Sequence, residues 1–381
     1  MEAYFDNAAT TRVADEVKEL VNQVMTIDYG NPSSRHQKGV DAGQYVKQAQ
    51  EIIAGTLKVE PKEIVFTSGG TESNNLALIG SALANQRRGK HIISTRIEHA
   101  SVYNPLLFLQ EMGYEITFLS VNEQGIVDLE ELKQALRPDT ILVSVMMVNN
   151  EIGAVEPVEV IGKIIKAYNP DILFHVDAIQ AYGKLKISPK RCRIDMLSVS
   201  GHKIHGPKGT GFLYIRDKVK IKPIIYGGGQ QKDMRSGTEN VPGIAGLGMA
   251  AKLMYTNHKE KIEQIQKVKD AFLSGVTQLE GVTEHSGEAP HIASVSFQGI
   301  EKGEVLLHAL EAKGVYCSSG SACSSNHPAI SGTLKAIGLE EDLLQATLRF
   351  SFSVYSTVEE AEYAVQVIAE ELPKRRKFVK R

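Results

Sequence analysis

Short apolar runs alternate with amphipathic stretches from about residue 40 to residue 220, and this alternation constrains the fold more than any other feature. Successive residues of a strand point to opposite faces of a sheet, and in these runs the residues on both faces are apolar or small. This is typical of strands buried on both faces. The stretches between them repeat apolar residues every three or four positions, as helices that cover a sheet do. The chain is therefore predicted to have an α/β fold with a mostly parallel sheet. We expect strands at residues 64–67, 91–94, 116–119, 141–148, 172–176 and 196–199, and helices at residues 45–53, 76–83, 102–109 and 158–165.

The pattern changes after a glycine run at residues 227–229, which we interpret as a flexible connection. A long helical pattern then leads into a region with fewer strands. A chain of 381 residues is long enough for two domains. We expect a helical stretch at residues 243–280, strands at 292–297 and 348–352, helices near 303–312 and 357–371, a large domain of residues 15–260, and a small α+β domain of residues 1–14 and 261–381.

Composition excludes several classes of protein. The first residues lack the basic start and apolar stretch of a signal peptide, and no run of about 18 apolar residues follows, so we expect a cytoplasmic protein with no membrane partner. The formal net charge of −2 gives no reason to expect nucleic acid as a direct partner. A basic stretch at residues 374–377, extended by Lys380 and Arg381, is interpreted as a solvated helix end, with an acidic partner or RNA as the alternative.

Polar residues follow several of the predicted strands, and ligands of open parallel sheets bind beyond the carboxyl ends of the strands. After the first strand, Gly70 and Thr71 begin a helix whose N–H groups and dipole favour a phosphate; the alternative is a tight turn capped by Thr71. After the strand at 172–176, Asp177 and Gln180 place a carboxylate beside an amide. Asp177 could cap a helix, hold a cation, or keep the ring nitrogen of a pyridine-type cofactor protonated.

Lys203 ends the motif Ser-Gly-His-Lys at residues 200–203, directly after another strand. A lysine in a glycine-rich turn beside a hydroxyl and an imidazole suits a Schiff base, because desolvation and nearby cations lower its pKa. The alternative is a phosphate-binding or merely exposed lysine. An anion-binding turn, a strand-end Asp177 and a strand-end Lys203 together fit one cofactor.

Two further strand ends carry residues with two interpretations. His99 could stack on a cofactor ring or shuttle a proton, or it could be structural. Asn150, in the sequence Asn-Asn-Glu-Ile-Gly, could bond a ligand through its amide, or it could belong to a turn.

The chain has three cysteines without the paired spacing of a zinc site or of secreted disulfides, so we expect reduced thiols. Cys323 lies in a stretch of small residues, Ser-Ser-Gly-Ser-Ala-Cys-Ser-Ser-Asn, that suits a mobile loop. A thiolate that attacks a substrate sulfur and then carries the product outward needs such a loop. The alternative is an incidental loop thiol. Cys192 and Cys317 lack this setting and are interpreted as structural.

Motifs over nearly the whole chain resemble those of the cysteine desulfurases of the NifS/IscS type, which have the class V, aspartate aminotransferase-like fold of pyridoxal-phosphate enzymes. The Gly-Ser-Ala-Cys form resembles the first of the two desulfurase groups. The matching motifs are Phe-Asp-Asn-Ala-Ala-Thr-Thr at 5–11, His-Val-Asp-Ala at 175–178, Ser-Gly-His-Lys at 200–203, Met-Arg-Ser-Gly-Thr at 234–238, Ser-Ser-Gly-Ser-Ala-Cys at 318–323 and Leu-Arg-Phe-Ser at 348–351.

The resemblance implies a role for each matching residue. Pyridoxal 5′-phosphate would be the cofactor, no resident metal is expected, and Cys323 could transiently ligate an iron–sulfur cluster. Lys203 would bind the cofactor covalently, His99 would stack on its ring, Asp177 would pair with the pyridine nitrogen and Gln180 with the ring hydroxyl. The cofactor phosphate would be held by Gly70, Thr71, Ser200 and His202, and Thr238 would reach the phosphate of the neighbouring subunit. Asn150 would approach the cofactor and the substrate, and Arg349 would bind the substrate carboxylate.

The implied reaction converts L-cysteine to L-alanine. Lys203 removes the Cα proton, and the Cys323 thiolate takes the sulfur as a persulfide. A homodimer is expected, and an iron–sulfur scaffold protein or a tRNA-thiolation carrier would accept the sulfur. Two alternatives stay open: a selenocysteine lyase or small-amino-acid transaminase of the same fold, and a non-catalytic assembly protein.

Overall fold

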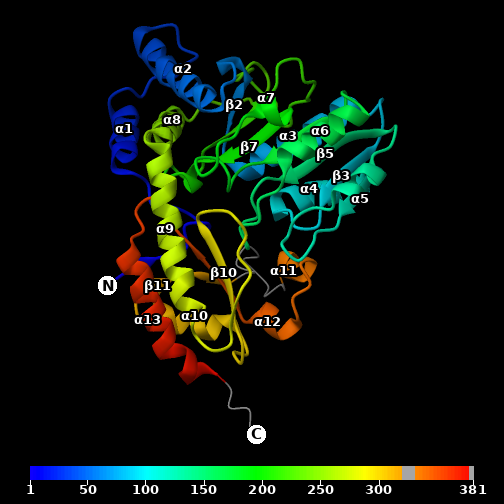
Figure 1. The fold of residues 1–381 in the computed structure, drawn as a ribbon. Coiled ribbons are helices and arrows are strands. Elements are labelled where there is room, and N and C mark those ends of the chain that lie inside the picture. Colours follow the sequence, from blue (N-terminus) through cyan, green and yellow to red (C-terminus); the bar gives the residue numbers. More distant parts are fainter. Residues whose placement is uncertain (320–330, 377–381) are drawn as a thin grey trace.

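The computed structural model describes residues 1–319 and 331–376 (Figure 1). A seven-stranded sheet has the order β2-β8-β7-β6-β5-β3-β4. Strand β8 is antiparallel to both of its neighbours, and the other pairs are parallel. The strands are β2 (Ile64–Thr67), β3 (His91–Thr95), β4 (Glu115–Leu119), β5 (Thr140–Met146), β6 (Leu173–Asp177), β7 (Met196–Ser200) and β8 (Gly211–Ile215).

Helices cover both faces of this sheet because its strands are apolar on both sides. Neighbouring residues show the alternation: Leu173 packs in the cluster that includes residues of α3 and α4, and Phe174 packs in the cluster that includes residues of α2, α6 and α8. The helices and short 3₁₀ turns of this part are α1 (Asp15–Thr26), α2 (Gln37–Leu57), η1 (Pro61–Glu63), α3 (Gly70–Asn85), α4 (Ala100–Glu111), α5 (Leu129–Ala135), α6 (Val158–Tyr168), α7 (Pro189–Cys192), η2 (Gly201–Lys203) and α8 (Val241–Tyr255).

A smaller α+β region lies beside the large sheet and includes the N-terminus (Figure 1). Its four-stranded antiparallel sheet has the order β12-β13-β10-β9, and β1 pairs in parallel with β11. Ala3 and Phe5 join its core, so the first residues pack with the last third of the chain. The elements are β1 (Ala3–Tyr4), α9 (His258–Val276), β9 (Val282–Glu284), β10 (Ile292–Phe297), α10 (Gly303–Glu311), β11 (Val315–Tyr316), β12 (Ser318–Ser319), α11 (Gly332–Ala336), α12 (Glu341–Gln345), β13 (Thr347–Ser351) and α13 (Val358–Arg375).

The predicted α/β class and the six strands of the large sheet are confirmed, with ends shifted by at most two residues. Two details were wrong. Strand β4 lies at the sheet edge and is partly exposed rather than buried on both faces. The single helical stretch at residues 243–280 is two helices, because Asn257 adopts a left-handed conformation with a φ of 51°. The domain boundaries stay a prediction.

Within the described residues, no helix combines the length and the apolar character needed to cross a membrane.

Candidate active site

A cavity of about 350 Å³ lies where the parallel strands β5, β6 and β7 end. Parallel strands bring their carboxyl ends to one edge, so side chains that follow different strands meet there. Two of the predicted site residues, Thr238 and Arg349, do not line the cavity, and Thr238 is exposed. Cys323 lies outside the described residues. The predicted residues that line it are Gly70, Thr71, His99, Asn150, Asp177, Gln180, Ser200, His202 and Lys203.

The start of helix α3 contributes to the lining of the cavity. Helix α3 begins at Gly70, and its N-cap residue Gly69 has no side chain to cap the first N–H groups, which are the kind of donors that bind anions at helix starts. A Cβ atom at Gly70 would lie 2.2 Å from Cδ1 of Ile179, so a larger residue would displace the Ile179 side chain, which also lines the cavity. Burial and the positive charges of nearby lysines lower the pKa of His202 to about 4. These lysines create a positive potential that suits a phosphate.

A hydrogen-bond network joins Asp177 to His99 in the lining of the cavity. Asn74 donates from Nδ2 to Oδ2 of Asp177 at 2.8 Å and to Oγ of Ser101 at 2.9 Å. The Oγ of Ser101 lies 2.8 Å from Nδ1 of His99, and the backbone N–H of Ser101 donates to the same nitrogen at 3.1 Å. Since Nδ1 accepts, the ring of neutral His99 carries its proton on Nε2. His99 therefore caps α4 and is oriented by its own helix.

Burial shifts both groups of this network towards their neutral forms. Burial raises the pKa of Asp177, against the hydrogen bonds from Ile179 and Asn74 and the charges of His99 and Lys203. Burial lowers the pKa of His99, although the charge of Asp177 opposes this shift. A cation placed against Asp177 would stabilise its carboxylate, and a protonated pyridine nitrogen is such a cation.

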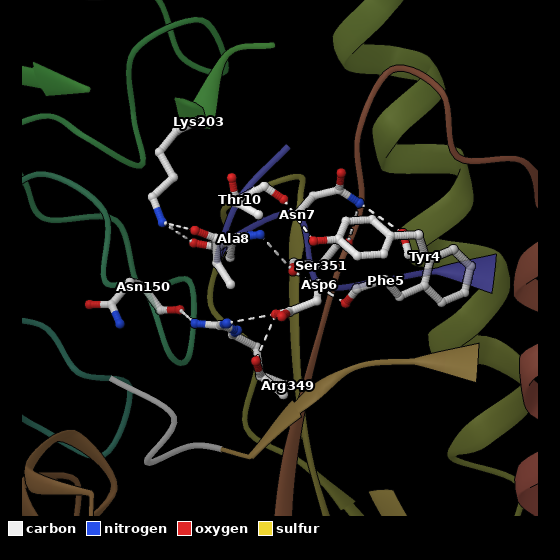
Figure 2. Close-up of polar contacts among 12 residues, drawn as sticks. Tyr4, Phe5, Asp6, Asn7, Ala8, Thr10, Asn150, Lys203, Arg349 and Ser351 are labelled. Atoms are coloured by element: carbon white, nitrogen blue, oxygen red, sulfur yellow. Dashed lines mark hydrogen bonds and ion pairs between the residues drawn. The ribbon is translucent and has the colours of Figure 1, made fainter. Parts of the chain in front are cut away.

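Lys203 projects from the turn η2 towards the N-terminal segment. Its Nζ donates to the carbonyl oxygens of Ala8 and Ala9, the latter at 2.7 Å (Figure 2). Gln180 donates from Nε2 to the Ala8 oxygen at 2.9 Å, and the Ala8 N–H donates to Oγ of Ser351 at 2.8 Å. Residues that begin the chain therefore form one wall of the cavity.

A second lysine lies beneath Lys203. Lys184 is 7% exposed, and its Nζ donates to the backbone oxygen of Lys203. Burial, together with the charge of Lys203, lowers the pKa of Lys184 to about 7. Lys184 therefore anchors the turn that carries Lys203.

Arg349 lies on β13, beside the cavity rather than in its wall. It is 3% exposed, donates from Nη1 to the Asn150 oxygen at 2.8 Å, and forms an ion pair from Nη2 to Oδ1 of Asp6 at 2.9 Å (Figure 2). Its Nε is buried and has no hydrogen-bond partner among the residues that the structure describes. A planar guanidinium with a spare buried donor suits a carboxylate ligand.

Sequence reasoning missed Asn74, Ser101, Lys184 and Asp6 as site residues. Asn74 and Ser101 each lie in a motif that drew attention for another residue, and Asp6 belongs to the N-terminal motif. No sequence signal distinguishes Lys184. Cys192 and Cys317 are buried in separate core clusters, as expected of structural residues.

Glu98, the neighbour of His99, predicts a pH dependence of stability. Burial raises the pKa of Glu98 to about 8, while its Oε1 accepts bonds from Met146 N–H and Thr95 Oγ1. The folded state binds this proton more tightly than the unfolded state, so the stabilisation is complete below about pH 4.5 and is lost as the pH rises through about 8. Glu98→Gln keeps the Oε1 acceptor and does not titrate. Its stability relative to the wild type should increase by about 4 kcal/mol between pH 5 and 9.

Urea unfolding followed by circular dichroism at a series of pH values measures this change. Glu123→Gln, at an exposed carboxyl, is the control and should follow the wild-type curve. A constant difference between Glu98→Gln and the wild type across this range would contradict the prediction.

Comparison with known proteins gives one consistent result. The aminotransferase class-V pattern matches residues 3–363. The chain is 42% identical to a protein named cysteine desulfurase IscS from Dictyoglomus turgidum, over 96% of this chain and 93% of the relative. A solved structure titled NifS-like protein superposes with a TM-score of 0.93 at 38% identity, covering 98% of this chain and all of the other. Another, titled SspA in complex with cysteine, has a TM-score of 0.81 at 36% identity and covers 93% of this chain and all of the other.

The match spans both the sheet that forms the cavity and the smaller region that supplies Arg349 and Asp6. Fold, sequence and the placement of the polar residues therefore agree. This chain belongs to the aminotransferase class-V family and, within it, to the cysteine desulfurases of the IscS and NifS type.

Proposed function

We propose that the chain is a pyridoxal-phosphate-dependent cysteine desulfurase that converts L-cysteine to L-alanine and receives the sulfur on Cys323. The principal support is the shared cavity of about 350 Å³ that the amine of Lys203, the carboxylate of Asp177 and the ring of His99 line together. The relatives named cysteine desulfurase, and the neighbour solved with cysteine, support the same substrate.

The residues around this cavity fit pyridoxal phosphate. The uncapped start of α3 and its positive surroundings suit the phosphate, and the buried Asp177 suits a protonated ring nitrogen. When bound, the cofactor supplies an electron sink that makes the substrate Cα proton removable. The residues that would hold it are Lys203 through a covalent bond, His99 against the ring, Asp177 at the ring nitrogen, Gln180 at the ring hydroxyl, Asn150 beside ring and substrate, and Gly70, Thr71, Ser200 and His202 at the phosphate.

The chain's own residues then perform the sulfur transfer. Arg349 orients the carboxylate of L-cysteine, and Lys203 accepts the Cα proton on Nζ. The Sγ of deprotonated Cys323 attacks the substrate sulfur, so a new S–S bond forms and the C–S bond breaks. The electron pair of that bond stays with the carbon, which gains a proton to become the methyl group of alanine. L-cysteine and the Cys323 thiol thus give L-alanine and a Cys323 persulfide.

Asp177→Asn tests the assignment to the ring nitrogen. The amide cannot stabilise a protonated pyridine as a carboxylate does, so kcat for alanine formation should fall about 100-fold while the protein stays folded. Steady-state kinetics and a thermal melt measure the two quantities. Asp171→Asn, at an exposed position in the turn before the same strand, is the control. A kcat within threefold of the wild type would contradict the assignment.

The remaining parts of the proposal concern partners and location. We expect a homodimer in which Thr238 reaches the phosphate of the neighbouring subunit, which agrees with its exposure and with its absence from the lining of its own cavity. An iron–sulfur scaffold protein or a tRNA-thiolation carrier is the expected acceptor, and the cytoplasm the expected location. Light scattering tests the dimer, persulfide mapping after a pull-down tests the acceptor, and cell fractionation tests the location.

The decisive experiment is an assay of the purified protein with pyridoxal phosphate, L-cysteine and dithiothreitol. Alanine and sulfide should appear in equal amounts. Activity with an amino-acid and keto-acid pair, but not with cysteine, would indicate a transaminase, and a strong preference for selenocysteine would indicate a lyase. A protein that binds no cofactor would refute the catalytic proposal.

A further inference from the structure

Asp6 is the partner of a deeply buried cation. Arg349 is 3% exposed, and its ion pair with Asp6 joins Nη2 to Oδ1 at 2.9 Å. Within the described residues, no other carboxylate lies at ion-pair distance from Arg349. Removing a guanidinium from water is unfavourable unless a charge and hydrogen bonds compensate, so Asp6 stabilises Arg349 in its buried position.

Two hydrogen bonds hold the guanidinium plane and leave a third donor available. Nη1 donates to the Asn150 oxygen at 2.8 Å, and Nη2 donates to Asp6 (Figure 2). A planar group bound at both terminal nitrogens cannot rotate about its last bond. Nε is buried and has no acceptor in the described part of the chain, which is unusual for a native N–H group. An arriving carboxylate would satisfy this donor.

Asp6 is itself held in place by the small sheet. Its Oδ1 also accepts a bond from Oγ of Ser318 at 2.7 Å. Ser318 lies directly opposite Arg349 in the antiparallel pair of β12 and β13, and the Asp6 backbone forms a parallel bridge with Ser351. The carboxylate is therefore fixed from two strands, and its position does not depend on the N-terminal segment alone.

We infer that Asp6 is a positioning residue for substrate recognition, which orients Arg349 so that its free Nε–H meets the α-carboxylate of the substrate. The inference rests on the proposed function, in which Arg349 binds that carboxylate. Asp6 touches Arg349 rather than the reacting atoms, so its loss should weaken binding of carboxylate-bearing ligands selectively. A ligand with the same amine and no carboxylate does not use Arg349 and should be unaffected.

The test compares L-alanine with ethylamine, which lacks only the carboxylate. Calorimetric titration of the cofactor-loaded protein gives both dissociation constants, and steady-state kinetics give kcat and KM for L-cysteine. In Asp6→Ala, the constant for L-alanine and the KM for L-cysteine should each rise about tenfold, as the loss of one charge-assisted hydrogen bond predicts. The constant for ethylamine and kcat should stay within about twofold. Asp6→Asn should restore L-alanine binding only in part, to a value between those of the wild type and Asp6→Ala, because its amide oxygen accepts the same two bonds but carries no charge.

Controls separate this role from a general structural one. Asp15→Ala removes an exposed carboxylate that pairs with Arg12 at 2.9 Å, and it should change neither ligand. Arg349→Ala should lose the preference for L-alanine, as Asp6→Ala does. If Asp6→Ala does not fold, Asp6→Ser, whose side chain is too short to reach Nη2, replaces it.

Three outcomes would overturn the inference: unchanged L-alanine binding in Asp6→Ala, equal weakening for ethylamine, or Asp6→Asn behaving like Asp6→Ala. Failure of the wild type to form alanine from cysteine would instead refute the proposed function. The L-alanine titration would still report on Asp6 in that case.

Discussion

Replacing Lys203 by alanine is expected to reduce alanine formation from L-cysteine by a factor of about 10⁴ or more. The substitution removes both the amine that would bind the cofactor and the base that would take the Cα proton. Both functions depend on the same atom, Nζ, so one substitution removes them together. Lys184 lies nearby, but its Nζ donates to the Lys203 carbonyl beneath the turn rather than lining the cavity.

Two measurements check this prediction independently. Borohydride reduction followed by mass spectrometry should label wild-type protein at Lys203 and leave the variant unlabelled, and an alanine assay gives the rate. Lys208→Ala, at an exposed lysine in the same glycine-rich motif, is the control and should retain labelling and most of the activity. A variant at position 203 that still forms a reducible adduct would exclude this lysine as the attachment site.

Cys323→Ser is expected to lower desulfuration of L-cysteine at least about 1,000-fold while leaving cofactor absorbance and L-alanine binding unchanged. A hydroxyl is far less nucleophilic than a thiolate and cannot hold a sulfane sulfur, so the reaction would stop before the C–S bond breaks. A substitution that damaged the cavity would weaken L-alanine binding as well, so unchanged binding with lost desulfuration indicates loss of the thiol itself.

Mass spectrometry after a single turnover should locate the persulfide on Cys323 in the wild type. Cys192→Ala, which removes a buried thiol from the core, is the control and should retain desulfuration. Full sulfide release by Cys323→Ser would show that another acceptor performs the transfer.

The large sheet could be predicted because its local pattern is strong. Strands such as β6 and β7 are apolar on both faces, so their sequence distinguishes them from the amphipathic helices between them. Strand β8 was missed because it follows a turn rather than a helix and runs antiparallel to its neighbours, outside the repeating pattern. The edge strand β4 was found, but its exposure depends on the position of the strand in the sheet, which local pattern does not encode.

The sequence by itself determined which residues could meet. Parallel strands end at one edge of a sheet, so recognising the strands before Asp177 and Lys203 was enough to predict that the two side chains lie close together. The tertiary structure alone decided which groups support them. Asn74 reaches Asp177 across 103 residues, and Asp6 reaches Arg349 across 343. Such contacts depend on how separate elements pack. A single buried hydrogen bond stabilises the fold by only about 1 kcal/mol and produces no repeating pattern in the sequence from which it could be predicted.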